Sequence, residues 1–328
     1  MSRCALVAGV ATAAGTALLI WQIQRTGLDR ISAGFAAVTW WGFLTILVLS
    51  LGRFLARSVA WTTLLPGRQP LGTALAATIS GDAVGSLTPL GLVVSEPAKA
   101  MYLSGPAGSA RTLAALAAEN FFYSVSVAIY VVLGTAAMLE AFSLPVEIVR
   151  AGIVALVLMA AVLAAAAWLA WQRPAVASAL LSRLPVRGLD SVVARVRDFE
   201  IQMYGSVGRE GGRLGGVIAC ETSFHVLSFL EAWLTLWLLT GQSLPIQAFV
   251  LDTFQRVVNI VFRIVPLGLG VTQVGSELVA RAIGLQPAVG LTLSLVVTAR
   301  RLVWAALGML LLLKRLRGGD ARNGAMGQ

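Results

Sequence analysis

The chain has 328 residues, of which 58% are hydrophobic and only 12% are charged, and its mean hydropathy is +0.83. A water-soluble domain could not bury this much apolar surface, so the composition excludes a soluble enzyme and predicts an integral membrane protein. The formal net charge of +10 does not indicate nucleic-acid binding, because the basic residues lie at the ends of apolar segments and in one loop. We expect membrane lipids, and no nucleic acid, as partners.

Apolar stretches long enough to cross a membrane occur at about 5–22, 38–57, 112–139, 147–171, 213–240 and 287–313. They predict an all-α fold with about six spanning helices in a single membrane domain, 1–328. The first stretch follows Arg3, as in a signal peptide, but no clear cleavage site precedes Trp21. We therefore expect an uncleaved first helix.

Two further apolar regions, 70–104 and 245–285, are each interrupted midway by the sequence Pro-Leu-Gly-Leu. Proline removes a backbone donor and glycine tolerates non-helical conformations, so each region is predicted to be two half-helices around a break. The residues that mark the two breaks are Pro89, Gly91, Pro266, Gly268 and Gly270.

Arginines orient these segments through the positive-inside rule. Loop 172–213 holds seven arginines and tail 314–328 is also basic, so both are predicted to be cytoplasmic, whereas loops 140–146 and 241–244 contain no Lys or Arg. Region 245–285 must then begin and end outside. Region 70–104, flanked by Arg57, Arg68 and Arg111, is predicted to enter from the cytoplasm. The two broken regions become opposed re-entrant hairpins.

The two breaks are 177 residues apart, from Pro89 to Pro266, and similar elements surround each of them. This predicts a first repeat half, 1–140, and a second half, 147–313, of opposite orientation. Inverted repeats with discontinuous helices are a recurring plan of transporters. The alternative is that Pro-Leu-Gly-Leu occurs twice by chance in a chain rich in leucine and glycine.

Segment 187–204 in the cytoplasmic loop is amphipathic, with apolar residues on one helical face and charges on the other. It is either an interfacial helix on the membrane surface or a solvated linker helix.

Charged side chains at bilayer depth cost about 2.5 kcal/mol or more each, so they mark candidate sites. In region 245–285, Asp252, Arg256, Asn259 and Arg263 share one helical stripe. Asp252 and Arg256 are spaced to pair, which leaves Arg263 to hold a phosphate. The alternative is that Arg263 pairs with Glu277, Glu231 or Glu221.

The first half offers carboxylates and a lysine. Ser95 is predicted to cap a helix that begins there. Glu96 either favours that helix N-terminus or lines a substrate site, and Lys99 is predicted to line the same site. Glu119 either carries a proton or pairs with Arg300 or Arg301.

In span 213–240, Glu221 and His225 are four residues apart. They form either a proton relay or a pair of satisfied buried groups.

Motifs of soluble catalysis, ATP hydrolysis and metal binding are absent from the sequence, and Cys4 and Cys220 are far apart. We therefore predict no cofactor, no metal and no catalytic residue.

These residues resemble the flippase-like family related to the membrane region of lysylphosphatidylglycerol synthases. The resemblance covers about 38–313 and rests on the first break with Ser95-Glu96-Pro97-x-Lys99, on Glu119, and on Arg263-x-x-Pro266-Leu267-Gly268-Leu269-Gly270-Val271 with Glu277. It implies a lipid-handling membrane domain that in some members moves a modified phospholipid between leaflets. The chain departs from the family pattern at two positions, because Ser95 replaces the usual glycine and Asn120 replaces a basic residue after Glu119.

The last predicted span is followed by only a short tail, so we expect no soluble aminoacyl-transferase domain and no lipid aminoacylation by this chain alone.

The leading hypothesis is a lipid transporter or flippase-like protein of a bacterial inner membrane. Arg263, Arg256 and Asn259 would hold an anionic headgroup, and Glu96, Lys99 and Glu119 would line the opposing half of the cavity. One rival is a membrane transferase that uses Glu96 or Glu119 as a base. The other is a non-catalytic scaffold for envelope-lipid biosynthesis enzymes.

Overall fold

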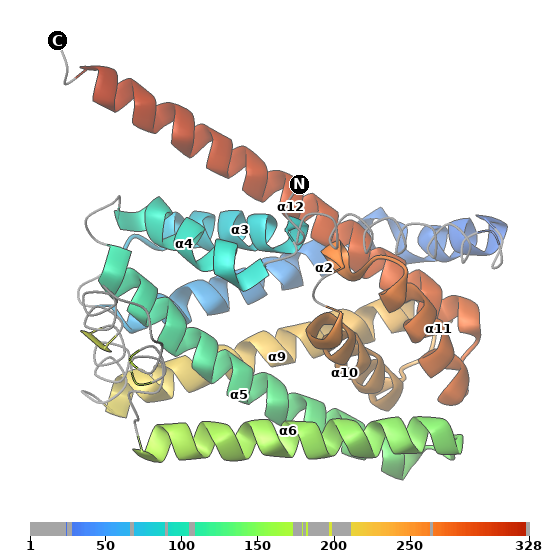
Figure 1. The fold of residues 1–328 in the computed structure, drawn as a ribbon. Coiled ribbons are helices and arrows are strands. Elements are labelled where there is room, and N and C mark those ends of the chain that lie inside the picture. Colours follow the sequence, from blue (N-terminus) through green and yellow to red (C-terminus); the bar gives the residue numbers. More distant parts are fainter. Residues whose placement is uncertain are drawn as a thin grey trace.

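The computed structural model describes residues 28–65, 69–88, 91–104, 109–172, 211–262 and 265–325, together with the isolated residues 24, 179, 182, 197 and 198. Every regular element in these ranges is helical (Figure 1). The helices are α2 (Leu28–Thr63), α3 (Leu71–Leu87), α4 (Gly91–Ser104), α5 (Ser109–Ala141), α6 (Val146–Gln172), α9 (Gly211–Thr240), α10 (Pro245–Val261), the 3-10 turn η1 (Pro266–Gly268), α11 (Val271–Ala282) and α12 (Pro287–Ala325).

Five of the described helices contain a segment long and apolar enough to cross a membrane. These segments are Ala36–Thr63, Thr112–Ala141, Val146–Trp168, Arg213–Thr240 and Pro287–Arg315. The prediction of an all-α integral membrane protein is confirmed. The predicted span 5–22 lies outside the described residues, as does segment 187–204 apart from residues 197 and 198.

Helices α2 and α9 form an antiparallel pair. A Cβ atom added at Gly42 would meet Leu238, one at Gly52 would meet Leu227, and one at Gly216 would meet Thr63. Small residues of this kind let helices approach closely within a membrane. Helix α2, kinked at Thr39, continues to Thr63, beyond the predicted end of the span at residue 57. The sequence had suggested that Arg57 flanks the first broken region. In the structure Arg57 lies within α2.

The two broken regions are found as two pairs of short helices, α3 with α4 and α10 with α11. The α3–α4 pair lies to the left of the α10–α11 pair in Figure 1. These helices have 17, 14, 17 and 12 residues. At about 1.5 Å per residue each is at most about 26 Å long, which is less than the roughly 30 Å of a hydrocarbon core.

The backbone conformation of the second break explains its glycines. Leu267, Gly268 and Gly270 have φ angles of 57°, 65° and 77°, in the left-handed region that interrupts a helix. A Cβ atom at Gly268 would lie 2.6 Å from Oγ1 of Thr272, so the turn also has no room for a side chain there. In the first pair, α3 ends at Leu87 and α4 begins at Gly91, while Pro89 lies outside the described residues.

Helix α12 packs against both broken pairs. Gly290 faces Ser276 and Ala280 of α11, and Gly308 faces Ile79 and Ala83 of α3. The 3-10 turn η1 also contacts α3, so the second break lies against the first pair. Helix α12 continues to Ala325, and most of the predicted tail 314–328 is therefore part of this helix.

Helix α6 lies at the edge of the bundle and packs on α5 (Figure 1). Of the most apolar 18-residue segment of α6, only 6% is buried within the protein, whereas the corresponding share for α5 is 33%. Most of the α6 surface is therefore left for lipid.

Candidate functional site

A cavity of about 520 Å³ lies between the two broken pairs. Its lining combines residues of α3, α4, α10 and η1 with residues of α2, α5, α6, α9 and α12. Six basic residues and four acidic residues line it, which gives the wall a formal charge of +2. They are Arg53, Arg57, Lys99, Arg256, Arg300 and Arg301, with Asp82, Glu96, Glu231 and Asp252.

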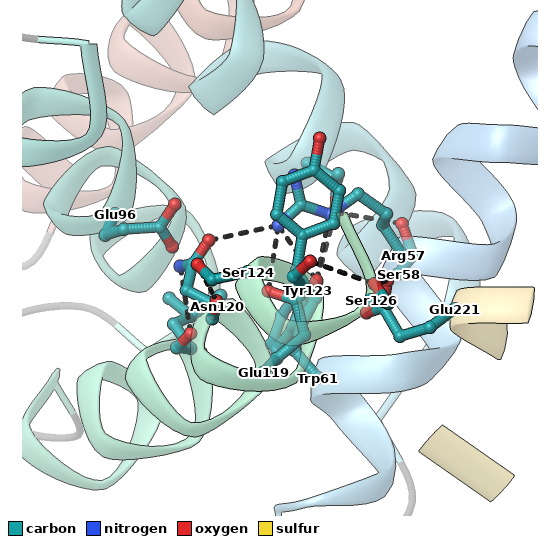
Figure 2. Close-up of polar contacts among 12 residues, drawn as sticks. Arg57, Ser58, Trp61, Glu96, Glu119, Asn120, Tyr123, Ser124, Ser126 and Glu221 are labelled. Atoms are coloured by element: carbon teal, nitrogen blue, oxygen red, sulfur yellow. Dashed lines mark hydrogen bonds and ion pairs between the residues drawn. The ribbon is translucent and has the colours of Figure 1, made fainter. Parts of the chain in front are cut away.

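Arg57 and Glu119 form a bidentate ion pair between α2 and α5 (Figure 2). Nε and Nη2 of Arg57 donate to the two carboxylate oxygens at 2.9 Å each, and Nη2 also donates to Asn120 Oδ1 at 3.1 Å. Glu119 is fully buried. The predicted pairing of Glu119 with Arg300 or Arg301 is wrong, because Arg57 occupies both of its oxygens. Arg57 and Asn120 line the cavity in front of it.

Glu231 of α9 is shared by two arginines. Arg53 of α2 donates from Nη1 at 3.0 Å, and Arg300 of α12 contacts both carboxylate oxygens. Glu231 and Arg300 are buried. One carboxylate between two guanidinium groups leaves a formal excess of one positive charge. Arg53 was not among the predicted site residues, although an arginine inside an apolar span indicates such a site.

The predicted pair of Asp252 and Arg256 on α10 is confirmed, with Nη2 of Arg256 3.1 Å from the carboxylate. Asp252 also accepts hydrogen bonds from the hydroxyl groups of Tyr130, at 2.7 Å, and Ser228, at 3.0 Å. Both charges of the pair are therefore compensated locally.

Arg301 of α12 holds the second break. Its Nη1 donates to Asn259 Oδ1 at 3.1 Å and to the backbone carbonyl of Leu267 at 3.3 Å. No carboxylate of the described residues lies within ion-pair distance of it, and Asp82 acts on it only as a nearby charge. Asn259, which was predicted to hold the headgroup, therefore accepts a hydrogen bond from Arg301. Predicted Arg263 lies outside the described residues.

Glu96 and Lys99 of α4 pair with each other across 2.8 Å and line the cavity. Ser95 donates a long hydrogen bond of 3.4 Å to Glu96. Because α4 begins at Gly91, Ser95 lies inside the helix, and its predicted capping role is wrong.

Glu221 and His225 meet on a common hydroxyl group. Ser126 Oγ lies 2.9 Å from His225 Nε2 and donates to Glu221 Oε2 at 3.5 Å. Both residues are buried, and the His225 ring stacks on Tyr130. Figure 2 places Glu221 and Ser126 beside the Arg57–Glu119 pair. The proton relay stays a prediction.

The sequence and structure of the chain were compared with known families, curated proteins and solved structures. No curated protein and no solved structure matches it. The family described as the lysylphosphatidylglycerol synthase TM region matches residues 6–308. This match spans nearly all of the described helices, including both broken pairs and the cavity between them, and the chain therefore belongs to the family of the lysylphosphatidylglycerol synthase TM region.

Proposed function

We propose that this membrane protein moves an anionic lipid between the two leaflets, with the headgroup passing through the cavity between the broken pairs. The observation that carries the proposal is a cavity whose wall has six basic and four acidic residues, surrounded by membrane-spanning helices. Charged side chains around an empty cavity in an apolar medium would cost free energy, so we expect a polar occupant. A lipid phosphate supplies the complementary charge.

Arg301 is the best anchor for that phosphate. Arg256, the anchor predicted from the sequence, already donates Nε and Nη2 to Asp252. Arg301 has no ion pair in the part of the chain that the structure describes, and only its Nη1 is hydrogen-bonded there. The guanidinium fork of Arg301 can therefore bind two phosphate oxygens.

We further propose that the two halves form an inverted repeat, which would open the cavity to one side of the membrane at a time. The offset of 177 residues carries the span Ala36–Thr63 onto Arg213–Thr240, and α2 and α9 run antiparallel. Helices α10, α11 and α12 begin within three residues of the positions that this offset predicts from α3, α4 and α5. Broken helices in two halves of opposite orientation give a transporter one gate toward each side.

The proposed setting is a bacterial inner membrane with the C-terminus in the cytoplasm, which the positive-inside rule supports. In a background with Cys4 and Cys220 replaced, single cysteines at the exposed positions Ser143, Ser243 and Ser182 test it. A membrane-impermeant maleimide is expected to label Ser143→Cys and Ser243→Cys from outside, and Ser182→Cys only after the membrane is opened. Labelling of all three from one side would contradict this topology.

Reconstituted liposomes test the transport itself. With a fluorescent phosphatidylglycerol in both leaflets, the protein is expected to expose the inner pool to an external quencher. Arg301→Ala is expected to slow this roughly tenfold, because a charge-assisted hydrogen bond contributes about 1.5–3 kcal/mol. Arg281→Ala is the matched control, since its side chain on α11 is 62% exposed and pairs with Glu277.

Rates equal to those of protein-free liposomes for anionic, zwitterionic and cationic lipids would contradict transport. Chemically altered lipid in the mass spectrum would instead favour the membrane transferase.

A further inference from the structure

The cavity is not charged on all sides. Large apolar side chains from α6 and from the C-terminal end of α10 also line it, namely Met159, Val162, Ile260 and Phe262, with Asn259 the polar neighbour that binds Arg301. We name these four apolar residues the apolar portal. Three of them are large apolar side chains with high exposure, at 41% for Val162, 45% for Ile260 and 43% for Phe262. The basic residues of the lining come from other helices, namely α2, α4 and α12, and from Arg256 on the preceding turn of α10.

The position of the portal matches the depth of lipid chains. Met159 is the middle residue of α6, which extends from Val146 to Gln172. A helix of this length spans the hydrocarbon core, so its middle residue lies near the bilayer centre. Helix α6 is also the least buried of the candidate spans. The apolar side of the cavity therefore faces hydrocarbon, and not the aqueous phase.

A polar end and an apolar end in one cavity fit an amphiphile. A headgroup gains hydrogen bonds and ion pairs at the arginines, whereas acyl chains would lose free energy if they were drawn past charged side chains. The chains must remain in contact with hydrocarbon while the headgroup crosses.

We infer that the apolar portal holds the acyl chains of a phospholipid whose phosphate is bound at Arg301 in the same cavity. This inference rests on the proposed function and assigns it a route, a lateral exit for the chains between α6 and the end of α10. The occupant is a phospholipid with an anionic headgroup, because the wall of the cavity has more basic than acidic residues.

Photo-crosslinking in vesicles of equal parts phosphatidylglycerol and phosphatidylcholine tests the portal. A photoreactive phenylalanine replaces Val162 in the full chain, and the captured lipids are identified by mass spectrometry. The control position is Val157, which is 63% exposed on the same helix but does not line the cavity. Position 162 is expected to capture phosphatidylglycerol over phosphatidylcholine by roughly tenfold, the factor that one charge-assisted hydrogen bond supplies.

The Arg301→Ala background completes the test. There the preference at position 162 is expected to fall to that of position 157, which captures lipid in the proportion of the bulk membrane. Equal capture of both lipids at position 162 in the unaltered background, or no capture at all, would overturn the portal.

Transport assays on the same vesicles separate the portal from the proposed function. Val162→Trp and Ile260→Trp are expected to slow lipid movement, whereas Val157→Trp is not, because only the first two fill the cavity. A lipid preference at position 162 without any lipid movement would contradict the proposed function but support the binding site. Lipid movement with no preference at position 162 and no effect of either tryptophan would contradict only the inference about the apolar portal.

Discussion

Glu231→Gln is expected to destabilise the folded protein by about 3–5 kcal/mol, because it removes the carboxylate that two guanidinium groups share, one of them buried. Arg53 and Arg300 both pair with Glu231, and the structure describes no other ion pair for either of them. The Arg300 side chain is only 7% exposed, so its freed charge is poorly solvated. The effect is measured as the loss of the thermal transition, followed by tryptophan fluorescence of the purified protein in detergent.

Two further variants make the reason testable. Glu277→Gln is the control, since its partner Arg281 is exposed and an exposed pair contributes about 0–1 kcal/mol. The double variant Glu231→Gln with Arg300→Gln removes one of the stranded charges and is expected to recover part of the lost stability. A double variant no more stable than Glu231→Gln alone would show that the two arginines do not depend on this carboxylate.

Gly290→Ala and Gly308→Ala are each expected to destabilise the protein by about 1–3 kcal/mol, the usual cost of adding atoms to a well-packed interior. The new methyl group would lie 2.2 Å from the carbonyl oxygen of Ser276 in the first variant and 2.5 Å from that of Ile79 in the second. These carbonyls belong to helix backbones, so α12 must move away from α11 or α3. Thermal melting in detergent and the yield of monodisperse protein measure the effect.

Gly215→Ala on α9 is the matched control for both glycine variants. A Cβ atom at Gly215 would meet nothing within 4 Å, and alanine favours a helix over glycine by about 1 kcal/mol. Gly215→Ala is therefore expected to leave stability unchanged or to raise it. If the three variants melted alike, close packing of α12 on the two broken pairs would not be what holds them.

The apolar helices are predictable from the sequence, because hydropathy and length are properties of contiguous residues. The predicted spans 112–139, 147–171, 213–240 and 287–313 each fall within a described helix. Both breaks were predicted for the same reason, since proline and glycine change the local backbone whatever surrounds them. The pair of Asp252 and Arg256 is also local, at a spacing of four residues on one helix.

The end of α2 shows where this reasoning stops. A charge normally ends a membrane span, so Arg57 was taken to flank the span 38–57. Helix α2 continues to Thr63 because Glu119 compensates the charge of Arg57 inside the protein. That carboxylate lies 62 residues away in the sequence, on α5. The residues next to Arg57 in the sequence therefore do not predict this ion pair.

The sequence by itself determined the class of protein, the positions of most helices, the two breaks and the presence of charged residues within apolar segments. The tertiary structure decided which charges compensate one another and which remain for a ligand. Arg53 and Arg300 reach Glu231 across 178 and 69 residues of sequence, whereas Arg301, the neighbour of Arg300, holds the break of the second pair instead. The physical reason is that an ion pair depends on distance in space, and helix packing brings distant residues together while it turns adjacent residues toward different partners.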